Sequence, residues 1–147
     1  MSIRIVVADH HALLRSCLKT LLEKQPGLAD VIEVDGGRRA VEFMAHPGAA
    51  GLPDVLILDL DMHDLGGLAA TRQIMLVQPQ ARILMLSWHD DLPLVSAALA
   101  AGARGYMLKD DPLPALVQAI RHVVAGRIHV SSSLQSQTSG DSMSAFC

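Results

Sequence analysis

The sequence has few aromatic residues, few cysteines and no excess of basic charge. Its aromatic residues are two phenylalanines, one tryptophan and one tyrosine, which leaves little to sandwich a flavin ring. Cys17 falls within a helical pattern and Cys147 is the last residue, which argues against a disulfide framework. The net charge of −3 provides no basic footprint for nucleic acid, so we expect this chain not to bind DNA by itself.

Long apolar runs are absent as well. No run approaches the length of a membrane span, and Arg4 interrupts the first apolar run, where a signal peptide would be uniformly hydrophobic. We therefore expect a cytoplasmic protein with no membrane segment. A length of 147 residues corresponds to one domain with a sizeable core.

Strand and helix patterns alternate along the chain. Strands are expected at 3–8, 31–34, 55–58, 83–86 and 105–108, and helices at 12–24, 36–44, 67–77, 92–101 and 112–125. This order predicts an α/β fold, with a doubly wound, five-stranded parallel sheet covered on both faces. From residue 131 on, seven of seventeen residues are serine and no apolar period is visible. We therefore divide the chain into a domain at 1–126 and a Ser-rich linker or tail at 127–147.

Polar residues follow four of these strands at the point where each strand ends. They are Asp9 and His10 after the first strand, Asp59 and Asp61 after the third, Ser87 after the fourth and Lys109 after the fifth. Parallel strands end at one edge of the sheet, where α/β proteins bind ligands. Carboxylates gathered there repel one another unless a divalent cation lies between them, and ammonium and hydroxyl groups suit phosphoryl oxygens. Asp59 is thus predicted to be a cation ligand, a nucleophile towards phosphorus, or both.

Four segments carry a resemblance to a known family. They are VVADHHALLR at 6–15, PDVLILDLDM at 53–62, LMLS at 84–87 and GARGYMLKD at 102–110. Over about Ile3 to Gly126 the chain resembles the receiver (CheY-like) domain of bacterial two-component response regulators. The first and last segments resemble the branch in which a LuxR-type helix-turn-helix domain follows the receiver.

The resemblance implies a flavodoxin-like fold with strand order 2-1-3-4-5 and a role for each polar residue. Asp59 would accept a phosphoryl group from a histidine kinase. Mg²⁺ would be held by Asp59, by the backbone carbonyl of Asp61 and by an acidic pair that begins at Asp9. Lys109 and Ser87 would bind phosphoryl oxygens, and Tyr106 would report the switch.

The resemblance also implies a switched transcriptional output, not turnover of a substrate. DNA would be bound only through a C-terminal domain that is missing from this chain. Leu113, together with the first helix, is a candidate for the face of a homodimer.

Histidines mark the main departures from the family. His10 stands where the second carboxylate of the acidic pair is usual, and His63 replaces a proline. Because His89 follows Ser87 by two residues, we expect all three histidines to lie near the pocket. Imidazole is a poor ligand for Mg²⁺. One interpretation is a site retuned for a softer ion such as Mn²⁺ or Zn²⁺, or one in which a cationic His10 partly stands in for Mg²⁺. The other is a receiver whose phosphorylation is weak or dispensable, with His10 and His63 as drift on an exposed rim. From the sequence alone we favour the second interpretation.

Two other functions compete with a phosphorylated receiver. One is a pseudo-receiver that works through protein contacts without phosphate. The other is a haloacid-dehalogenase-type phosphatase, which also uses the pattern Asp59-Leu60-Asp61 after an apolar strand. In such phosphatases that motif ends the first strand of the domain, whereas here two strand–helix units precede it, so we rank the phosphatase below both receiver interpretations.

Overall fold

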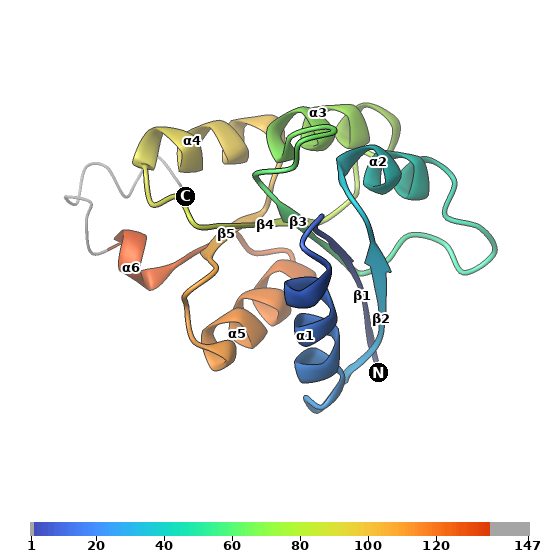
Figure 1. The fold of residues 1–147 in the computed structure, drawn as a ribbon, viewed down its shortest axis with the longest axis horizontal. Helices are drawn as coiled ribbons and strands as arrows, with labels where there is room; N and C mark the ends of the chain where they lie inside the picture. The colour runs from blue at the N-terminus through green and yellow to red at the C-terminus, as the bar shows by residue number, and fades with distance from the viewer. Residues whose placement is uncertain (1, 136–147) are drawn as a thin grey trace.

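The computed structural model describes residues 2–135, in which strands and helices alternate (Figure 1). The strands are β1 (Ile3–Ala8), β2 (Leu28–Val34), β3 (Val55–Asp59), β4 (Ile83–Ser87), β5 (Gly105–Leu108) and β6 (His129–Val130). The helices are α1 (Ala12–Glu23), α2 (Gly37–Ala45), α3 (Gly67–Val77), α4 (Leu92–Ala101), α5 (Leu113–Val124) and α6 (Ser132–Gln135). The predicted elements all form, with most ends within one or two residues of the predicted positions.

The strands form one parallel sheet in the order β2-β1-β3-β4-β5-β6. Helices α1 and α5 cover one face, and α2, α3 and α4 cover the other (Figure 1). The doubly wound α/β fold and the strand order 2-1-3-4-5 are confirmed for the first five strands. The carboxyl ends of the strands meet at one edge, as this topology requires.

The predicted count of five strands is wrong, because residues 129–130 add a sixth strand to the described part of the chain. Val130 and Leu134, which are 6% and 0% exposed, anchor β6 and the short α6 in the core. The Ser131 amide also donates to the Tyr106 carbonyl over 2.8 Å. Two apolar residues among serines are too few to make a visible period, which is why this stretch was predicted to be linker. Residues 136–147 of the predicted tail lie outside the described residues.

Strand β2 begins three residues earlier than predicted. Its pairing with β1 shifts register between Arg4 and Ile5, opposite Asp30, which has a φ of +53°. Such a left-handed residue interrupts the alternation of a strand and marks a bulge. The sequence pattern therefore revealed only the regular part of β2 after the bulge.

Successive residues of the central strands serve two separate cores. On the α2–α3–α4 side lie Val6, Leu56 and Leu58, and on the α1–α5 side lie Val7 and Ile57, all at most 1% exposed. Strand β3 is buried on both faces over its whole length, as its apolar run predicted. A strand packed on both faces holds its last residue, Asp59, in a fixed position.

Gly67 allows α3 to start directly beside the end of β3. A Cβ atom at this position would lie 2.5 Å from the Asp59 carbonyl oxygen and 2.8 Å from the Leu60 Cα atom. Any side chain at residue 67 would therefore push the helix away from the strand. The close approach fixes the loop between Asp59 and Gly67, which carries Asp61 and His63.

Candidate functional site

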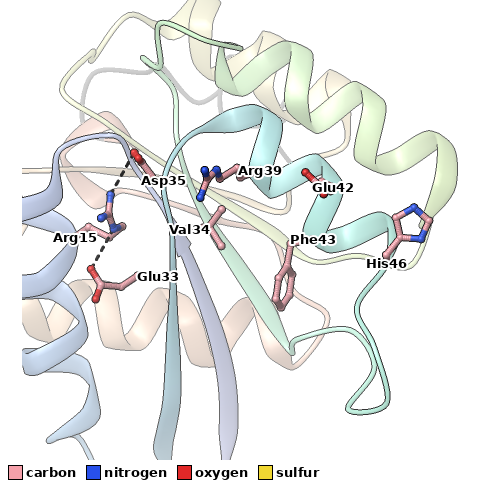
Figure 2. Close-up of a pocket in the computed structure, with 8 residues that line it drawn as sticks. All are labelled: Arg15, Glu33, Val34, Asp35, Arg39, Glu42, Phe43 and His46. Carbon is pink, nitrogen blue, oxygen red and sulfur yellow. Dashed lines mark hydrogen bonds and ion pairs between the residues drawn. The ribbon is translucent and has the colours of Figure 1, made fainter.

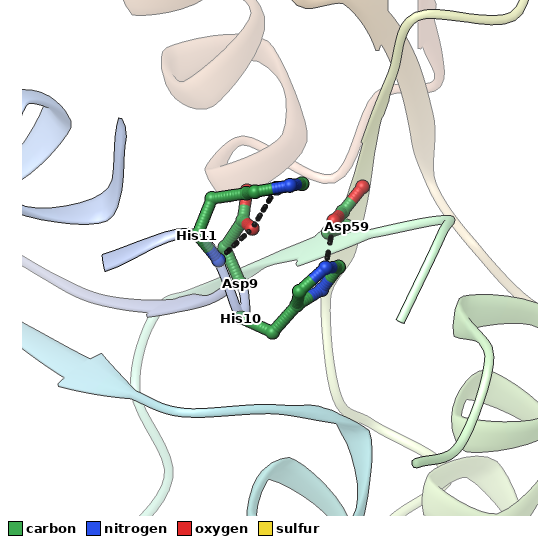
Figure 3. A group of neighbouring side chains, drawn as sticks. All are labelled: Asp9, His10, His11 and Asp59. Carbon is green, nitrogen blue, oxygen red and sulfur yellow. Dashed lines mark hydrogen bonds and ion pairs between the residues drawn. The ribbon is translucent and has the colours of Figure 1, made fainter. Parts of the chain in front are cut away.

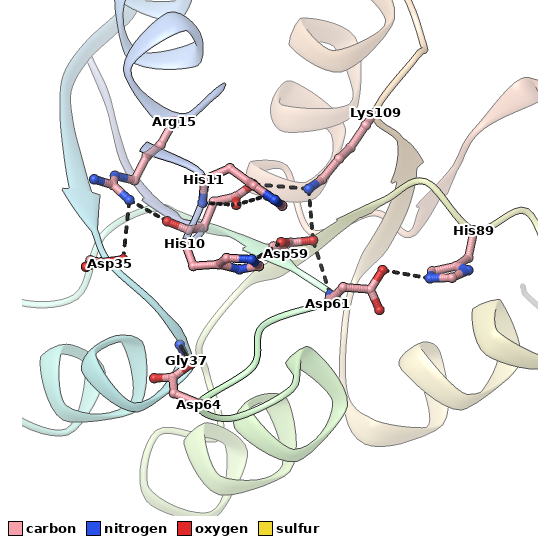
Figure 4. A network of polar contacts seen from close by, with 11 residues as sticks. His10, His11, Arg15, Asp35, Gly37, Asp59, Asp61, Asp64, His89 and Lys109 are labelled. Atoms are coloured by element: carbon pink, nitrogen blue, oxygen red, sulfur yellow. Dashed lines mark hydrogen bonds and ion pairs between the residues drawn. The ribbon is translucent and has the colours of Figure 1, made fainter. Parts of the chain in front are cut away.

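Three buried side chains meet at the carboxyl edge of the sheet, and Figure 4 shows two of them, Asp59 and Lys109. Asp9 directly follows β1, Asp59 is the last residue of β3 and Lys109 directly follows β5. The side chains of all three are 2% exposed. The sequence predicted that strand ends would gather these residues, and the structure does bring them together.

Lys109 lies between the two carboxylates. Its Nζ atom is 3.2 Å from Asp9 Oδ2 and 3.0 Å from Asp59 Oδ1. Backbone amides supply further bonds, since His11 N–H donates to Asp9 Oδ1 over 2.9 Å and Asp61 N–H donates to Asp59 Oδ1 over 3.2 Å. Of the four oxygens of these two carboxylates, Asp59 Oδ2 is buried and has no hydrogen-bond partner among residues 2–135.

The pKa of Asp59 is raised above its ordinary value of 3.8. Burial is the largest cause and repulsion from Asp9 is the second, while Lys109 acts in the opposite direction. Two carboxylates and one ammonium leave a net negative charge in a site with almost no solvent. A further positive group close to Asp59 would therefore be favourable.

Imidazole rings lie on the open side of this pair (Figure 3). His10 Nδ1 is 3.9 Å from Asp59 Oδ2, and His11 Nδ1 is 3.3 Å from Asp9 Oδ1. The His10 ring also contacts the His11 ring at 4.1 Å and the edge of the His63 ring at 4.2 Å between centroids. Asp9, His10, His11 and Asp59 each offer one ligand atom, and these atoms all lie within 4.8 Å of one another, so the cluster could bind a metal ion.

A second polar network extends from Ser87 towards the surface. The His89 amide donates to Ser87 Oγ over 2.9 Å, and the Tyr106 hydroxyl donates to the His89 carbonyl over 2.8 Å. Tyr106 is fully buried, and burial raises the pKa of its hydroxyl, against the opposing effect of a hydrogen bond with Ser87. The phenol therefore stays protonated and keeps donating its hydrogen bond to the loop that carries His89.

The histidines do not gather as the sequence suggested. Of the three expected near the pocket, His10 and His63 are in contact, but His89 Nε2 lies 2.6 Å from Asp61 Oδ2 on the other side (Figure 4). From the sequence we predicted no special role for His11, yet its ring reaches the Asp9 carboxylate. The available signal was its spacing, because an Asp side chain commonly accepts the amide two residues on and so holds that residue beside it.

An open pocket of about 590 Å³ lies nearby between β2 and α2 (Figure 2). Its main cation, Arg15, is already paired with Glu33 at 3.1 Å and Asp35 at 3.6 Å. Arg15 also donates to the Asp9 carbonyl oxygen over 2.5 Å. The Arg15 guanidinium is thus already occupied, and its contribution to the site is to hold the backbone of Asp9.

Comparison with known proteins agrees with this geometry. Residues 5–121 match the sequence model described as the response regulator receiver domain. The chain belongs to this family. The match covers every residue of the buried site, and it decides against the haloacid-dehalogenase-type phosphatase.

This receiver is similar to several described proteins. It is 34% identical over 128 residues to the transcriptional regulatory protein DegU of Brevibacillus brevis, covering 87% of this chain and 52% of that protein. It is 33% identical over 135 residues to the response regulator GacA of Pseudomonas aeruginosa, covering 92% and 61%. A crystal structure of a LuxR-family two-component response regulator from Aurantimonas sp. SI85-9A1 superimposes with a TM-score of 0.84 at 32% identity, covering 92% of this chain and 94% of that one.

The coverages also show how much of each relative this chain corresponds to. The chain spans about half to three-fifths of the length of the curated regulators it matches. DegU is a transcriptional regulatory protein and the Aurantimonas protein is a LuxR-family regulator, in agreement with the branch that the sequence resembles. Between residues 2 and 135, no helix is both long and apolar enough to span a lipid bilayer.

Proposed function

We propose that Asp59 is the phosphoacceptor of this receiver and takes its phosphoryl group from a histidine kinase. The observation that carries the proposal is the state of the Asp59 carboxylate, which is 2% exposed, bonded to Lys109 on one oxygen and, within residues 2–135, unpartnered on the other. A buried carboxylate of this kind is destabilised as an anion, which favours its reaction with an electrophile.

The transfer is a displacement at phosphorus. An Asp59 oxygen forms a new P–O bond, the P–N bond of the phosphohistidine breaks, and the departing imidazole nitrogen keeps the electron pair. The Lys109 ammonium, 3.0 Å from Asp59 Oδ1, neutralises charge on the phosphoryl oxygens. Ser87, at the end of the neighbouring strand, offers its hydroxyl to another phosphoryl oxygen.

The switch follows from a competition for Ser87. At present Ser87 Oγ accepts the His89 amide, and the His89 carbonyl accepts the Tyr106 hydroxyl. A phosphoryl group on Asp59 would draw the Ser87 hydroxyl towards itself and alter both bonds. Tyr106 then reports phosphorylation to the α4–β5 surface, which we propose controls a DNA-binding domain and a homodimer in the complete cytoplasmic regulator.

The magnesium ion usual for receivers fits these side chains poorly. Asp9, Asp59 and the Asp61 backbone carbonyl would hold it, and it would supply positive charge beside the phosphoryl group. However, the position of the second carboxylate is His10, whose Nδ1 atom lies 3.9 Å from Asp59 Oδ2. Mg²⁺ requires oxygen ligands in near-octahedral geometry. This departure is the observation that favours the second candidate function, a pseudo-receiver that acts without phosphate.

The test uses the only tryptophan. Trp88 directly follows Ser87 and is 61% exposed, so its fluorescence senses the Ser87 loop. The chain is titrated with beryllofluoride, a mimic of the phosphoryl group, with Mg²⁺, Mn²⁺, Zn²⁺ or no metal. Phosphate-affinity electrophoresis after incubation with acetyl phosphate provides a second readout.

Asp59→Asn should abolish both signals, because it removes the acceptor. Asp61→Asn is the matched control, since it keeps the backbone carbonyl and changes only a side chain that bonds His89. We expect the control to be phosphorylated like the natural chain. If the natural chain takes up no phosphoryl group with any of these ions, the pseudo-receiver is the correct function.

A further inference from the structure

We propose that Asp9, His10, His11 and Asp59 form a binding site selective for Zn²⁺ or a chemically similar transition-metal ion over Mg²⁺. The proposal names the ion of the acceptor site and rests on the proposed function for its link to signalling. It reverses the preference drawn from the sequence, where His10 and His63 were interpreted as drift on the rim. The reason for the reversal is that Lys109 and the two histidines contact different oxygen atoms of Asp9 and Asp59.

Lys109 uses one oxygen of each carboxylate and leaves the other. Its Nζ atom contacts Asp9 Oδ2 and Asp59 Oδ1. The remaining oxygens, Asp9 Oδ1 and Asp59 Oδ2, are the atoms closest to the rings of His11 and His10 respectively. Two carboxylate oxygens and two imidazole nitrogens thus converge on one side of the pair (Figure 3).

Two of these ligand atoms have no other partner. Asp59 Oδ2 and His10 Nδ1 are both buried, and neither makes a hydrogen bond within the described part of the chain. Asp59 is 2% exposed and its free oxygen points at the His10 ring (Figure 3). A buried anionic oxygen without a partner is costly, and it gains most from a cation bound directly to it.

The two measured ligand-atom pairs are close enough together to share one bound ion. With metal–ligand distances of about 2.1 Å, neighbouring ligand atoms are roughly 3.4 Å apart around a tetrahedral ion and roughly 3.0 Å apart around an octahedral one. The measured pairs are 3.3 Å for His11 Nδ1 to Asp9 Oδ1 and 3.9 Å for His10 Nδ1 to Asp59 Oδ2. Small side-chain rotations would close the wider pair onto an ion.

Ring packing holds His10 in place for this role. The His63 ring meets the His10 ring nearly edge-on, at an interplanar angle of 68°, and the His11 ring contacts it at an interplanar angle of 35°. His11 is 57% exposed, which leaves a path for an ion to enter. Mixed nitrogen and oxygen ligands favour zinc, whereas Mg²⁺ takes oxygen ligands, so the side chains themselves select between the two.

The experiment measures metal binding on the whole chain after removal of metals with a chelator. Zn²⁺ and Mg²⁺ affinities are determined by competition with a chromophoric indicator, and Co²⁺ serves as a spectroscopic probe of coordination number. His10→Gln removes one ligand, and His46→Gln is the matched control because His46 lies at the end of α2, outside the cluster. Urea midpoints verify that each variant is folded.

We expect the natural chain to bind Zn²⁺ more tightly than Mg²⁺, and Co²⁺ to give the intense visible bands of a four-coordinate site. His10→Gln should weaken Zn²⁺ binding at least about 10-fold, since even indirect partners of a metal ligand contribute that much. His46→Gln should change nothing, and His10→Asp should weaken Zn²⁺ and strengthen Mg²⁺. Tighter binding of Mg²⁺ by the natural chain, or a Zn²⁺ affinity that His10→Gln leaves unchanged, would overturn the proposal.

Failure of this proposal is distinguishable from failure of the proposed function. Metal affinity is read without any phosphoryl donor, whereas phosphoryl acceptance is read as a mobility shift that depends on Asp59. Zn²⁺ binding without phosphorylation would refute only the phosphoacceptor role. Phosphorylation with Mg²⁺ and no His10-dependent Zn²⁺ binding would refute only the metal assignment.

Discussion

Replacing Lys109 with methionine would remove the cation that lies between two buried carboxylates. The Lys109 ammonium is within 3.2 Å of both Asp9 and Asp59, and all three side chains are 2% exposed. Methionine has a similar length and no charge, so packing changes little. The loss of stability therefore measures the repulsion between the carboxylates and their desolvation.

The size of this loss has an upper bound. Removing one partner of a buried ion pair typically costs about 3–5 kcal/mol. One carboxyl can instead take up a proton, and its ordinary pKa is 3.8. At pH 7 that proton costs about 3.2 pH units at 1.36 kcal/mol each, so repulsion between the carboxylates adds at most about 4.4 kcal/mol to the loss. At pH 5 the proton costs about 1.2 pH units, which limits the same contribution to about 1.6 kcal/mol.

Urea denaturation in the presence of a chelator, at pH 7 and pH 5, measures the free energy of unfolding. We expect the Lys109→Met chain to be closer in stability to the natural chain at pH 5 than at pH 7. The double variant Lys109→Met with Asp59→Asn should recover the larger part of the loss at pH 7, because only Asp9 then remains charged. A loss that is the same at both pH values, or that Asp59→Asn does not reduce, would show that charge burial is not its cause.

Three further predictions concern the elements around the site. Asp64→Ala removes the carboxylate that accepts two backbone amides at the start of α2, both over 3.1 Å, and should lower the free energy of unfolding by about 1 kcal/mol in urea titrations. Burial raises the pKa of Asp64, but hydrogen bonds from these amides lower it more, and the net pKa lies below 3.8. The stabilisation by Asp64 is therefore present at neutral pH and is lost as the pH falls through the folded-state pKa. A stability difference between the natural chain and Asp64→Ala that does not shrink in acid would contradict this role for the carboxylate. Gly67→Ala should lower the free energy of unfolding by about 1–3 kcal/mol and reduce beryllofluoride binding, because its Cβ would lie 2.5 Å from the Asp59 carbonyl oxygen. An unchanged unfolding temperature in calorimetry together with an unchanged Trp88 titration would refute this. Tyr106→Phe loses the bond to the His89 carbonyl and should cost roughly 0.5–1.5 kcal/mol, with faster amide exchange in the loop after β4; unchanged exchange there would mean that the hydroxyl does not hold the loop.

The central part of the fold and site could be predicted because it follows from strand patterns. An apolar run such as Val55–Leu58 has one way to be buried on both faces, and a parallel sheet brings the ends of its strands to one edge. Asp9, Asp59 and Lys109 are therefore neighbours whatever their side-chain conformations are. Their closeness is a property of topology, and topology is visible in the order of strands and helices.

The arrangement of the histidines could not be predicted in the same way. His10, His11 and His63 lie in loops, where ring positions depend on backbone turns and side-chain rotamers that leave no periodic signal. The same holds for His89, which the sequence placed near the pocket and which instead bonds Asp61. The sixth strand was missed because Val130 and Leu134 are isolated apolar residues whose burial depends on contacts with distant parts of the chain.

The two edge strands of the sheet, β2 and β6, are less regular or shorter than the strands between them, and this affects self-association. On one side β2 carries an irregularity at Asp30, and on the other β6 has only two residues. Bulged or very short outer strands offer few unpaired amides and carbonyls to another molecule. A chain shortened to residues 1–126 would remove β6 and uncover one edge of the buried strand β5. By pairing with β5, residues 129–130 therefore hinder the addition of a strand from another molecule to this edge of the sheet.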